Sequence, residues 1–357
     1  MERINVTKSF LPPLDEYYEY LKEIWSNTQL TNHGSLLKQF EKEVSSYLNV
    51  QNLHFLSSGT VALQLALRAL DITEGEIITT PFTYVATTSA ILWERCKPVY
   101  VDIDPKSLCI NPDKIEAAIT KKTKAIMPVH VFGHAYGLDK IEAIAKKHKL
   151  KVIYDAAHAF DVKYKNKSLL DYGDISICSF HATKLFHTIE GGCIVSKSKD
   201  THDKIELMKR FGHDGDDHKS LGINAKASEF QAAMGLSNLK YVGESIAKRK
   251  HVSEVYDHYL KGKFTIPEVD SDTQYNYSYY PVIVENEKTL KRIMKKLNAK
   301  NIHPRRYFYP SLNKLPYLDD QQDCPVSEDI ASRIMCLPLY DDLSDKSVKK
   351  ICEAILS

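Results

Sequence analysis

The segment SFHATKLFHTIEGG, residues 179–192, places one lysine, Lys184, among aromatic, histidine and hydroxyl side chains. Phe180, Leu185 and Phe186 flank this lysine in the sequence. A lysine walled by apolar groups is partly desolvated, which lowers the pKa of its amine and frees it as a nucleophile. A surface lysine whose stem lies on apolar neighbours explains the same local pattern. The segment alone leaves both interpretations open.

A second pattern is the tetrapeptide SSGT, Ser57 to Thr60, which opens the almost wholly apolar stretch 60–70. A helix that begins here presents unpaired N–H groups and a positive dipole, and Gly59 allows a ligand to approach the backbone. This is the shape of a phosphate cradle, although a serine N-cap followed by a turn glycine gives the same residues. Neither G-x-G-x-x-G nor a Walker motif occurs, which argues against a dinucleotide or ATP.

The third pattern is KVIYDAAHAF, which places Asp155 at the end of an apolar run and His158 three residues later. A carboxylate in such a place is costly unless it meets a cation or hydrogen-bond donors. It would bind a metal, cap a helix or pair with a protonated ring nitrogen.

Together the three patterns favour one chemistry. A phosphate cradle, a strand-end carboxylate and a lysine 29 residues after Asp155 are the parts that hold pyridoxal phosphate. Asp155 would keep the pyridine nitrogen protonated, so that the ring accepts electrons from a carbon that loses its proton. Lys184, once displaced by an incoming amine, would move protons between carbon atoms.

The surrounding sequence alternates between strand-like and helical patterns, which predicts an α/β domain with a mostly parallel, doubly covered sheet. Ligands in such sheets lie beyond the carboxyl ends of the strands, where the three patterns fall. The predicted strands are 76–80, 97–103, 124–130, 151–157, 175–180, 192–197 and 279–285. The predicted helices are 40–48, 60–70, 83–93, 112–120, 138–149, 287–299 and 345–356, with a long helical pattern over 228–262.

Composition excludes several classes of partner. The 357 residues carry 48 Lys and Arg against 46 Asp and Glu, a net charge of +2, so nothing favours nucleic acid or a membrane surface. No signal-like or 18-residue apolar stretch occurs, and we expect a cytoplasmic protein. Seven cysteines without a C-x-x-C indicate reduced thiols. His130 and His134 in HVFGH have no nearby carboxylate, so no metal site is expected.

At these residues the sequence resembles the DegT/StrS family of pyridoxal-phosphate sugar aminotransferases. The resemblance rests on SSGTVALQLAL, EIITTPFTYVATTSAI, KAIMPVHVFGHAYGLD, VIYDAAHAF, CSFHATKLFHTIEGGCIV and LGINAKASEFQAAMGL, in this order along nearly the whole chain. It implies the type I aminotransferase fold, with a large mixed-sheet α/β/α domain over residues 1–240 and a smaller α+β domain over 241–357. It also implies a homodimer with shared active sites.

The resemblance implies a role for each matching residue. Lys184 would carry the cofactor covalently, Asp155 would pair with the pyridine nitrogen, and His158 would lie near the phenolic oxygen of the ring. Tyr84 would stack on the ring, and Asn224 would reach the phosphate from the neighbouring subunit. The remaining cofactor-binding residues would be Ser58, Gly59, Thr60 and Ser179.

For the substrate, His181, Arg306 and Tyr307 are candidates, and Arg305 with Arg306 would suit a nucleotide diphosphate bidentately. A surface role for these arginines is an open alternative. Because Lys184 is present where some relatives carry histidine and dehydrate, the resemblance implies transamination.

The expected reaction moves an amino group from L-glutamate, through pyridoxamine phosphate, to dTDP-4-keto-6-deoxyglucose, giving dTDP-4-amino-4,6-dideoxyglucose for surface polysaccharide such as O-antigen. Alternatives are a UDP-linked 4-keto sugar, amination at C3, and a regulatory protein that keeps the fold without turnover.

Overall fold

The structure is a computed structural model, and it describes residues 3–357. A seven-stranded sheet forms its centre, in the order β2-β10-β9-β6-β5-β3-β4. Only β10 runs against its two neighbours, and the other strands share one direction. The strands span Leu53–Leu56 (β2), Glu76–Thr79 (β3), Lys97–Tyr100 (β4), Thr123–Met127 (β5), Lys151–Asp155 (β6), Ile175–Ser179 (β9) and Gly192–Ser196 (β10). The expected mostly parallel sheet is confirmed, with one antiparallel strand inserted.

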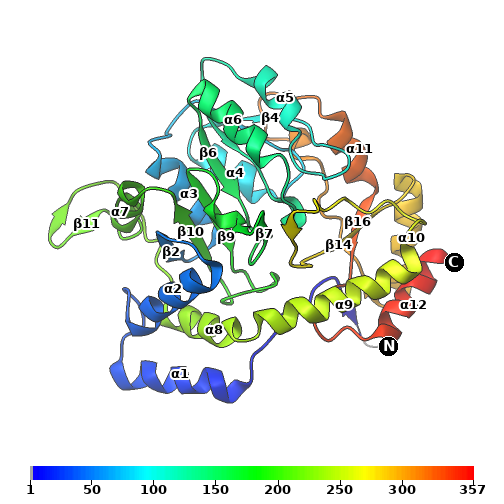
Figure 1. Cartoon of the computed structure of the whole chain (residues 1–357), viewed down its shortest axis with the longest axis horizontal. Coiled ribbons are helices and arrows are strands. Elements are labelled where there is room, and N and C mark those ends of the chain that lie inside the picture. Colours follow the sequence, from blue (N-terminus) through cyan, green and yellow to red (C-terminus); the bar gives the residue numbers. More distant parts are fainter. Residues whose placement is uncertain (1–2) are drawn as a thin grey trace.

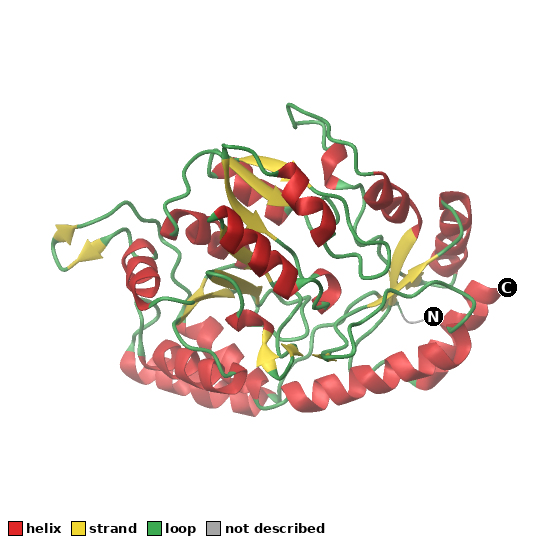
Figure 2. Ribbon diagram, turned by 45° about the horizontal axis from the view of Figure 1, so that its top comes forward, coloured by secondary structure: helices red, strands yellow, loops and turns green. Residues whose placement is uncertain are grey.

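Helices cover both faces of this sheet (Figures 1 and 2). Successive strand residues alternate between the faces: Ile78 and Tyr154 join one apolar cluster, while Ile77 and Ile153 join the other. On the first face lie α2 (Ser35–Leu48), α6 (Leu138–His148) and α8 (Glu229–Leu239), and on the second lie α3 (Gly59–Ala69), α4 (Ala86–Trp93) and α7 (Lys199–Met208). The strands are therefore apolar on both sides, as doubly covered strands must be.

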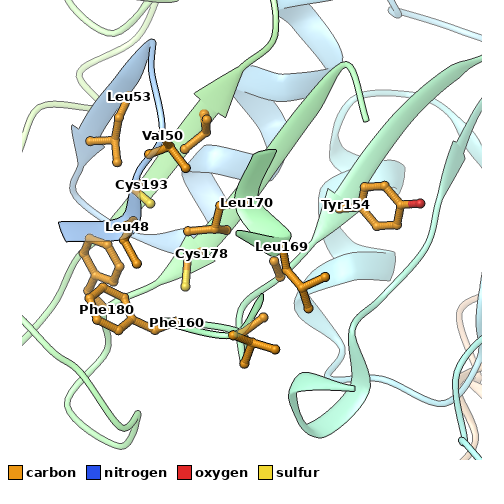
Figure 3. Packing of buried hydrophobic residues seen from close by; sticks show 14 of the residues in the cluster. Leu48, Val50, Leu53, Tyr154, Phe160, Leu169, Leu170, Cys178, Phe180 and Cys193 are labelled. Atoms are coloured by element: carbon orange, nitrogen blue, oxygen red, sulfur yellow. The ribbon is translucent and has the colours of Figure 1, made fainter. Parts of the chain in front are cut away.

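The first-face core anchors the segment that carries Lys184. Figure 3 shows Phe160 and Phe180 side by side, below Cys178 and Cys193, which pair across β9 and β10. Phe186 stacks on Phe160 with ring centroids 4.2 Å apart. Burying a phenylalanine side chain contributes about 1.5–3 kcal/mol, so Phe180 and Phe186 hold the two ends of the lysine loop in the core.

A second unit packs beside the sheet domain, around the long helix α9 (Val242–Leu260). Figure 1 shows α9 alongside α12 (Asp345–Leu356), and the two helices are in contact. Antiparallel strands β14 (Tyr280–Ile283) and β16 (Ile334–Leu337), with helices α10 (Glu287–Ala299) and α11 (Pro325–Arg333), complete this unit. The division at residues 240 and 241 stays a prediction. The first strand, β1 (Ile4–Asn5), nevertheless pairs with β15 (Ile302–His303) of the second unit.

Several elements differ from the sequence-based predictions. The helical pattern over 228–262 is two helices, because the chain turns at 240–241 between α8 and α9. The helix expected over 112–120 is a single α-turn, α5 (Pro112–Ile115), followed by the 3₁₀ turn Glu116–Ala118. Helix α1 (Leu14–Asn27) was not predicted from its pattern. The remaining short strands are β7 (Lys163–Tyr164), β8 (Lys167–Ser168), β11 (His213–Asp214), β12 (Asp217–His218) and β13 (Thr273–Gln274).

Within residues 3–357, no helix has the length and apolar character needed to span a bilayer. The β11–β12 hairpin projects from the body beyond α7 (Figures 1 and 2).

Candidate active site

A cavity of about 620 Å³ opens at the carboxyl ends of β6 and β9, between the sheet domain and the second unit. Most of the predicted site residues line it, although they come from five separate stretches of the chain. These residues are Ser58, Gly59, Thr60, Tyr84, Asp155, His158, Ser179, His181, Lys184 and Tyr307. Asn224 and Arg306 do not line it.

Lys184 lies in the loop after β9, where its backbone N–H donates to the carbonyl of His181 at 2.9 Å. Its Nζ donates to the Tyr279 hydroxyl at 3.4 Å. Burial lowers the pKa of the Lys184 amine, and the negative charge of Asp155 partly opposes that shift. Lys184 is therefore desolvated, as its aromatic neighbours led us to expect, and burial favours the neutral form of its amine.

Tyr279 was missed by the sequence analysis. It belongs to the second unit and comes 95 residues after Lys184, so no local pattern connects the two. Its ring meets the His158 ring at 4.9 Å and 62°. Burial raises the pKa of the Tyr279 phenol, so at neutral pH it remains a neutral group that both donates and accepts.

Asp155 ends strand β6 with its carboxylate inside the protein. Its Oδ2 accepts from the Thr87 hydroxyl at 2.7 Å, and its Oδ1 accepts from the Ala157 N–H at 3.1 Å. Burial raises the pKa of this carboxyl, while both hydrogen bonds and the charge of Lys184 lower it. A turn rather than a helix follows Asp155, so the bond to the Ala157 N–H stabilises that turn and is not the helix cap considered for this residue, and the carboxyl group lines the cavity.

His158 is fixed in one tautomer by the backbone. Its Nδ1 faces the N–H of Phe132 at 3.2 Å and must accept, so the ring proton resides on Nε2. Burial lowers the pKa of His158 well below its usual value, and the nearby Lys184 adds to the shift. The ring lies parallel to Phe308, 5.7 Å away and tilted by 2°. His158 is thus a neutral donor through Nε2.

The turn before α3 brings three chain segments into backbone contact. A Cβ on Gly59 would come within 3.1 Å of the Ser179 Cβ, and one on Gly192 would come within 2.6 Å of the Gly59 nitrogen. Gly192 is explained by this close approach of β10 to the start of α3, whereas a Cβ on Gly191 would meet Thr188 and Phe55. Ser58 caps α3, its Oγ accepting from the Val61 N–H at 3.2 Å. The first N–H groups of α3 remain for an anion.

Tyr84 and His181 lie at the rim of the cavity. Tyr84 is 59 % exposed just before α4, with one side against the cavity. The His181 Nδ1 lies 2.8 Å from the Thr183 hydroxyl, and its Nε2 lies 3.5 Å from the Glu190 carboxylate.

Arg306 is placed away from the cavity, contrary to its assignment as a substrate residue. Its Nη2 donates to the carbonyl of Ser332 at 2.8 Å and lies 3.2 Å from the Glu287 carboxylate. The guanidinium also covers the Tyr309 ring at 3.4 Å. These contacts occupy it in holding the second unit together, whereas the adjacent Arg305 lines the cavity.

Asn224 is exposed and lies beyond the β11–β12 hairpin, where its backbone forms an isolated β-bridge with Arg210.

His130 and His134 are buried, and burial lowers the pKa of each to about 4. Their Nδ1 atoms contact the carbonyls of His134 and Ser107, respectively. In residues 3–357, no three metal-ligating side chains gather.

Comparisons with known proteins identify the family. The family model described as "DegT/DnrJ/EryC1/StrS aminotransferase family" matches residues 14–356. A Shigella dysenteriae protein described as dTDP-4-amino-4,6-dideoxy-D-glucose transaminase is 42 % identical over 360 residues, covering 99 % of this chain and 98 % of its own. An Escherichia coli protein with the same description is 39 % identical over 366 residues, covering 99 % and 98 %.

Solved structures agree. The structure of DesI in the presence of its TDP-sugar product matches with a TM-score of 0.94 at 29 % identity, over 99 % of this chain and 92 % of that chain. Helicobacter pylori PseC, an aminotransferase of pseudoaminic acid biosynthesis, matches with a TM-score of 0.92 at 27 % identity, over 99 % and 98 %. The expected type I aminotransferase fold is confirmed. The chain belongs to the DegT/DnrJ/EryC1/StrS aminotransferase family and is an aminotransferase.

Proposed function

We propose that this aminotransferase uses pyridoxal phosphate to move an amino group from L-glutamate to C4 of dTDP-4-keto-6-deoxyglucose, which yields dTDP-4-amino-4,6-dideoxyglucose. The observation that carries the proposal is that the Lys184 amine, the Asp155 carboxylate and the start of α3 face one cavity. The descriptions of the two relatives at 42 % and 39 % identity support this substrate. The proposal extends to the use of this amino sugar in surface polysaccharide such as O-antigen and to a cytoplasmic location of the reaction.

The residues of the cavity fit pyridoxal phosphate. The helix start at Gly59 and Thr60, with Ser179 against it, offers N–H and hydroxyl donors to a phosphate. Asp155 suits the pyridine nitrogen, the His158 Nε2 proton suits the phenolic oxygen, and Tyr84 offers a ring face. Ser58 contributes through its cap of α3. When bound, the cofactor supplies an electron sink and, as pyridoxamine phosphate, stores the amino group between the two half-reactions.

The chain's own residues would then divide the work of proton transfer and orientation. Burial lowers the pKa of the Lys184 amine and so favours its neutral form, which is the form that takes a proton from carbon and returns it. Thr87 holds the Asp155 carboxylate in place. Tyr279, within hydrogen-bond reach of Nζ, orients the amine when it is not covalently engaged.

The proposal includes a homodimer in which Asn224 reaches the partner's phosphate site. Support comes from exposed apolar side chains beside Asn224, since Leu221 is 76 %, Phe211 50 % and Ile223 41 % exposed. Mixing inactive Lys184→Ala and Asn224→Ala subunits should restore activity in part, because one site of each mixed dimer has both residues. Mixed dimers without any gain would refute the shared site.

The reaction tests the function directly. Purified protein, pyridoxal phosphate, L-glutamate and dTDP-4-keto-6-deoxyglucose should give a nucleotide product with an equatorial amine at C4, seen by mass spectrometry and NMR. Lys184→Ala should bind the cofactor without a covalent link and lose turnover by several orders of magnitude, since nucleophile and proton carrier vanish together. Near-normal turnover in that variant would overturn the mechanism.

The remaining alternatives give different results in the same assay. If the dTDP sugar is untouched and a UDP-linked 4-keto sugar or a 3-keto sugar is aminated instead, that sugar is the substrate. A chain that does not convert pyridoxal phosphate to its amine form with any amino acid would be the regulatory protein.

A further inference from the structure

A two-stranded parallel ribbon forms one wall of the cavity and has two different faces. Strands β1 and β15 pair with Ile4 opposite Ile302 and Asn5 opposite His303. Ile302 is fully buried in the core of the second unit, and Ile4 packs against the same core. Since side chains alternate along a strand, the other face carries the residues on either side of the isoleucines. The cavity-lining residues of this face are Arg3, Asn5, His303 and Arg305.

The polar face is basic. Its two arginines are both exposed, and neither has a carboxylate partner among the ion pairs of residues 3–357. Three other arginines of the second unit each pair with a carboxylate: Arg249 with Asp341, Arg306 with Glu287, and Arg333 with Asp329. Positive charge is thus left uncompensated where the cavity opens.

The arginines are nevertheless held in place. The backbone of Arg305 is fixed from both sides, since its N–H donates to the Cys336 carbonyl at 3.2 Å and its carbonyl accepts from the Cys336 N–H at 2.8 Å. Its guanidinium lies 5.6 Å from the centre of the Tyr307 ring, which itself lines the cavity. The Arg3 Nε donates to Asn5 Oδ1 at 2.9 Å, which orients that guanidinium along the ribbon. Held side chains lose less freedom on binding.

We infer that the polar face of the β1–β15 ribbon, with Arg3 and Arg305 as its cations, binds the diphosphate of the nucleotide-linked substrate. The inference rests on the proposed function, because it assumes a nucleotide sugar. Two guanidinium groups present paired donors to phosphate oxygens and match a ligand with two negative charges. The sugar would then extend from this wall toward Lys184, which lines the same cavity.

Titration calorimetry with the full chain loaded with pyridoxal phosphate tests this subsite, using dTDP as the probe. Arg3→Gln and Arg305→Gln should each weaken dTDP binding roughly tenfold, about 1.4 kcal/mol, and rising salt should weaken the wild type more than either variant. The matched control is Arg292→Gln, which removes the same charge from the exposed side of α10 in the same unit. It should bind dTDP as the wild type does.

Two results would overturn the inference. One is unchanged dTDP affinity in both ribbon variants. The other is a glutamate half-reaction slowed in Arg305→Gln with dTDP binding unaltered, which would assign the arginine to a carboxylate of the amino donor. Conversion of the cofactor to its amine form by L-glutamate in the wild type tests the proposed function separately. If L-glutamate converts the cofactor to its amine form but dTDP binding does not depend on either arginine, the proposed function stands and the proposed diphosphate subsite is wrong.

Discussion

Replacing Thr87 with valine tests how far the Thr87 hydroxyl favours the ionised form of the buried Asp155 carboxyl group. Valine preserves the shape of threonine and removes the hydroxyl that donates to Asp155 Oδ2 at 2.7 Å. Only the Ala157 N–H then donates directly to the carboxylate. A hydrogen bond to a charged group contributes roughly 1.5–3 kcal/mol. Because this hydrogen bond favours the ionised form, its loss should raise the pKa of Asp155 further.

The sign of the pH dependence follows from this shift. Burial already raises the pKa of Asp155 above its value in the unfolded chain, so the ionised group costs stability at neutral pH. Thr87→Val increases that cost by roughly 1.5–3 kcal/mol near neutral pH, and the increase shrinks as the pH falls through the pKa of Asp155 in the folded protein.

Urea unfolding of the cofactor-free protein at several pH values measures this difference, with Thr87→Ser as the matched control that keeps the hydroxyl. The loaded valine variant should also transaminate more slowly, because a less ionised Asp155 holds the pyridine nitrogen less well. Equal stabilities and equal pH dependence for the valine and serine variants would refute the role of Thr87.

Three further predictions concern other parts of the chain. Tyr279→Phe should leave KM unchanged and lower kcat roughly tenfold. It should also lower the pKa of Lys184, which is measured by site-resolved acetylation of the cofactor-free protein. An unchanged pKa of Lys184 would contradict a functional contact between Nζ and the Tyr279 hydroxyl. His134, with its pKa lowered to about 4, should cost roughly 2 kcal/mol of unfolding free energy at pH 5 relative to pH 7, because the unfolded ring protonates first. In urea unfolding, His134→Gln should flatten that slope, and an unchanged slope would exclude the histidine. Glu229 accepts from two backbone N–H groups at the start of α2, so Glu229→Ala should lower the urea midpoint by the equivalent of roughly 2–4 kcal/mol; a loss under about 0.5 kcal/mol would count against this cap.

The sequence predicted the large domain well because its signals are local there. Alternating apolar runs and helical spacing indicate doubly covered strands, and the ends of β6 and β9 place Asp155 and Lys184 at one edge of the sheet. The antiparallel direction of β10 was not visible, because a buried strand has the same apolar pattern in either direction.

The contact between Tyr279 of the second unit and Lys184 was missed by sequence reasoning, and the reason is geometric. Tyr279 reaches Lys184 only because the two units pack together, and no spacing within one segment encodes that contact. Arg305 and Arg306 are neighbours in the sequence with the same charge, so composition cannot rank them. Strand alternation can, once a strand is known: His303 and Arg305 share the face of β15 and its extension that lines the cavity, while Arg306 turns toward Glu287.

That alternation becomes readable only through the pairing of β1 with β15, which joins residues about 300 positions apart. Two-residue strands carry no periodic signal, and Arg3 in isolation is an ordinary charged residue near a chain end. The pairing packs the partly buried Ile4 beside Ile302 and thereby fixes which way Arg3 points. The same apolar contact that closes the second unit therefore places a cation at the cavity. A polar residue in place of Ile4 should loosen the β1–β15 ribbon, because Ile4 packs against the core of the second unit. It should therefore weaken dTDP binding, although the side chain at position 4 would not contact the ligand.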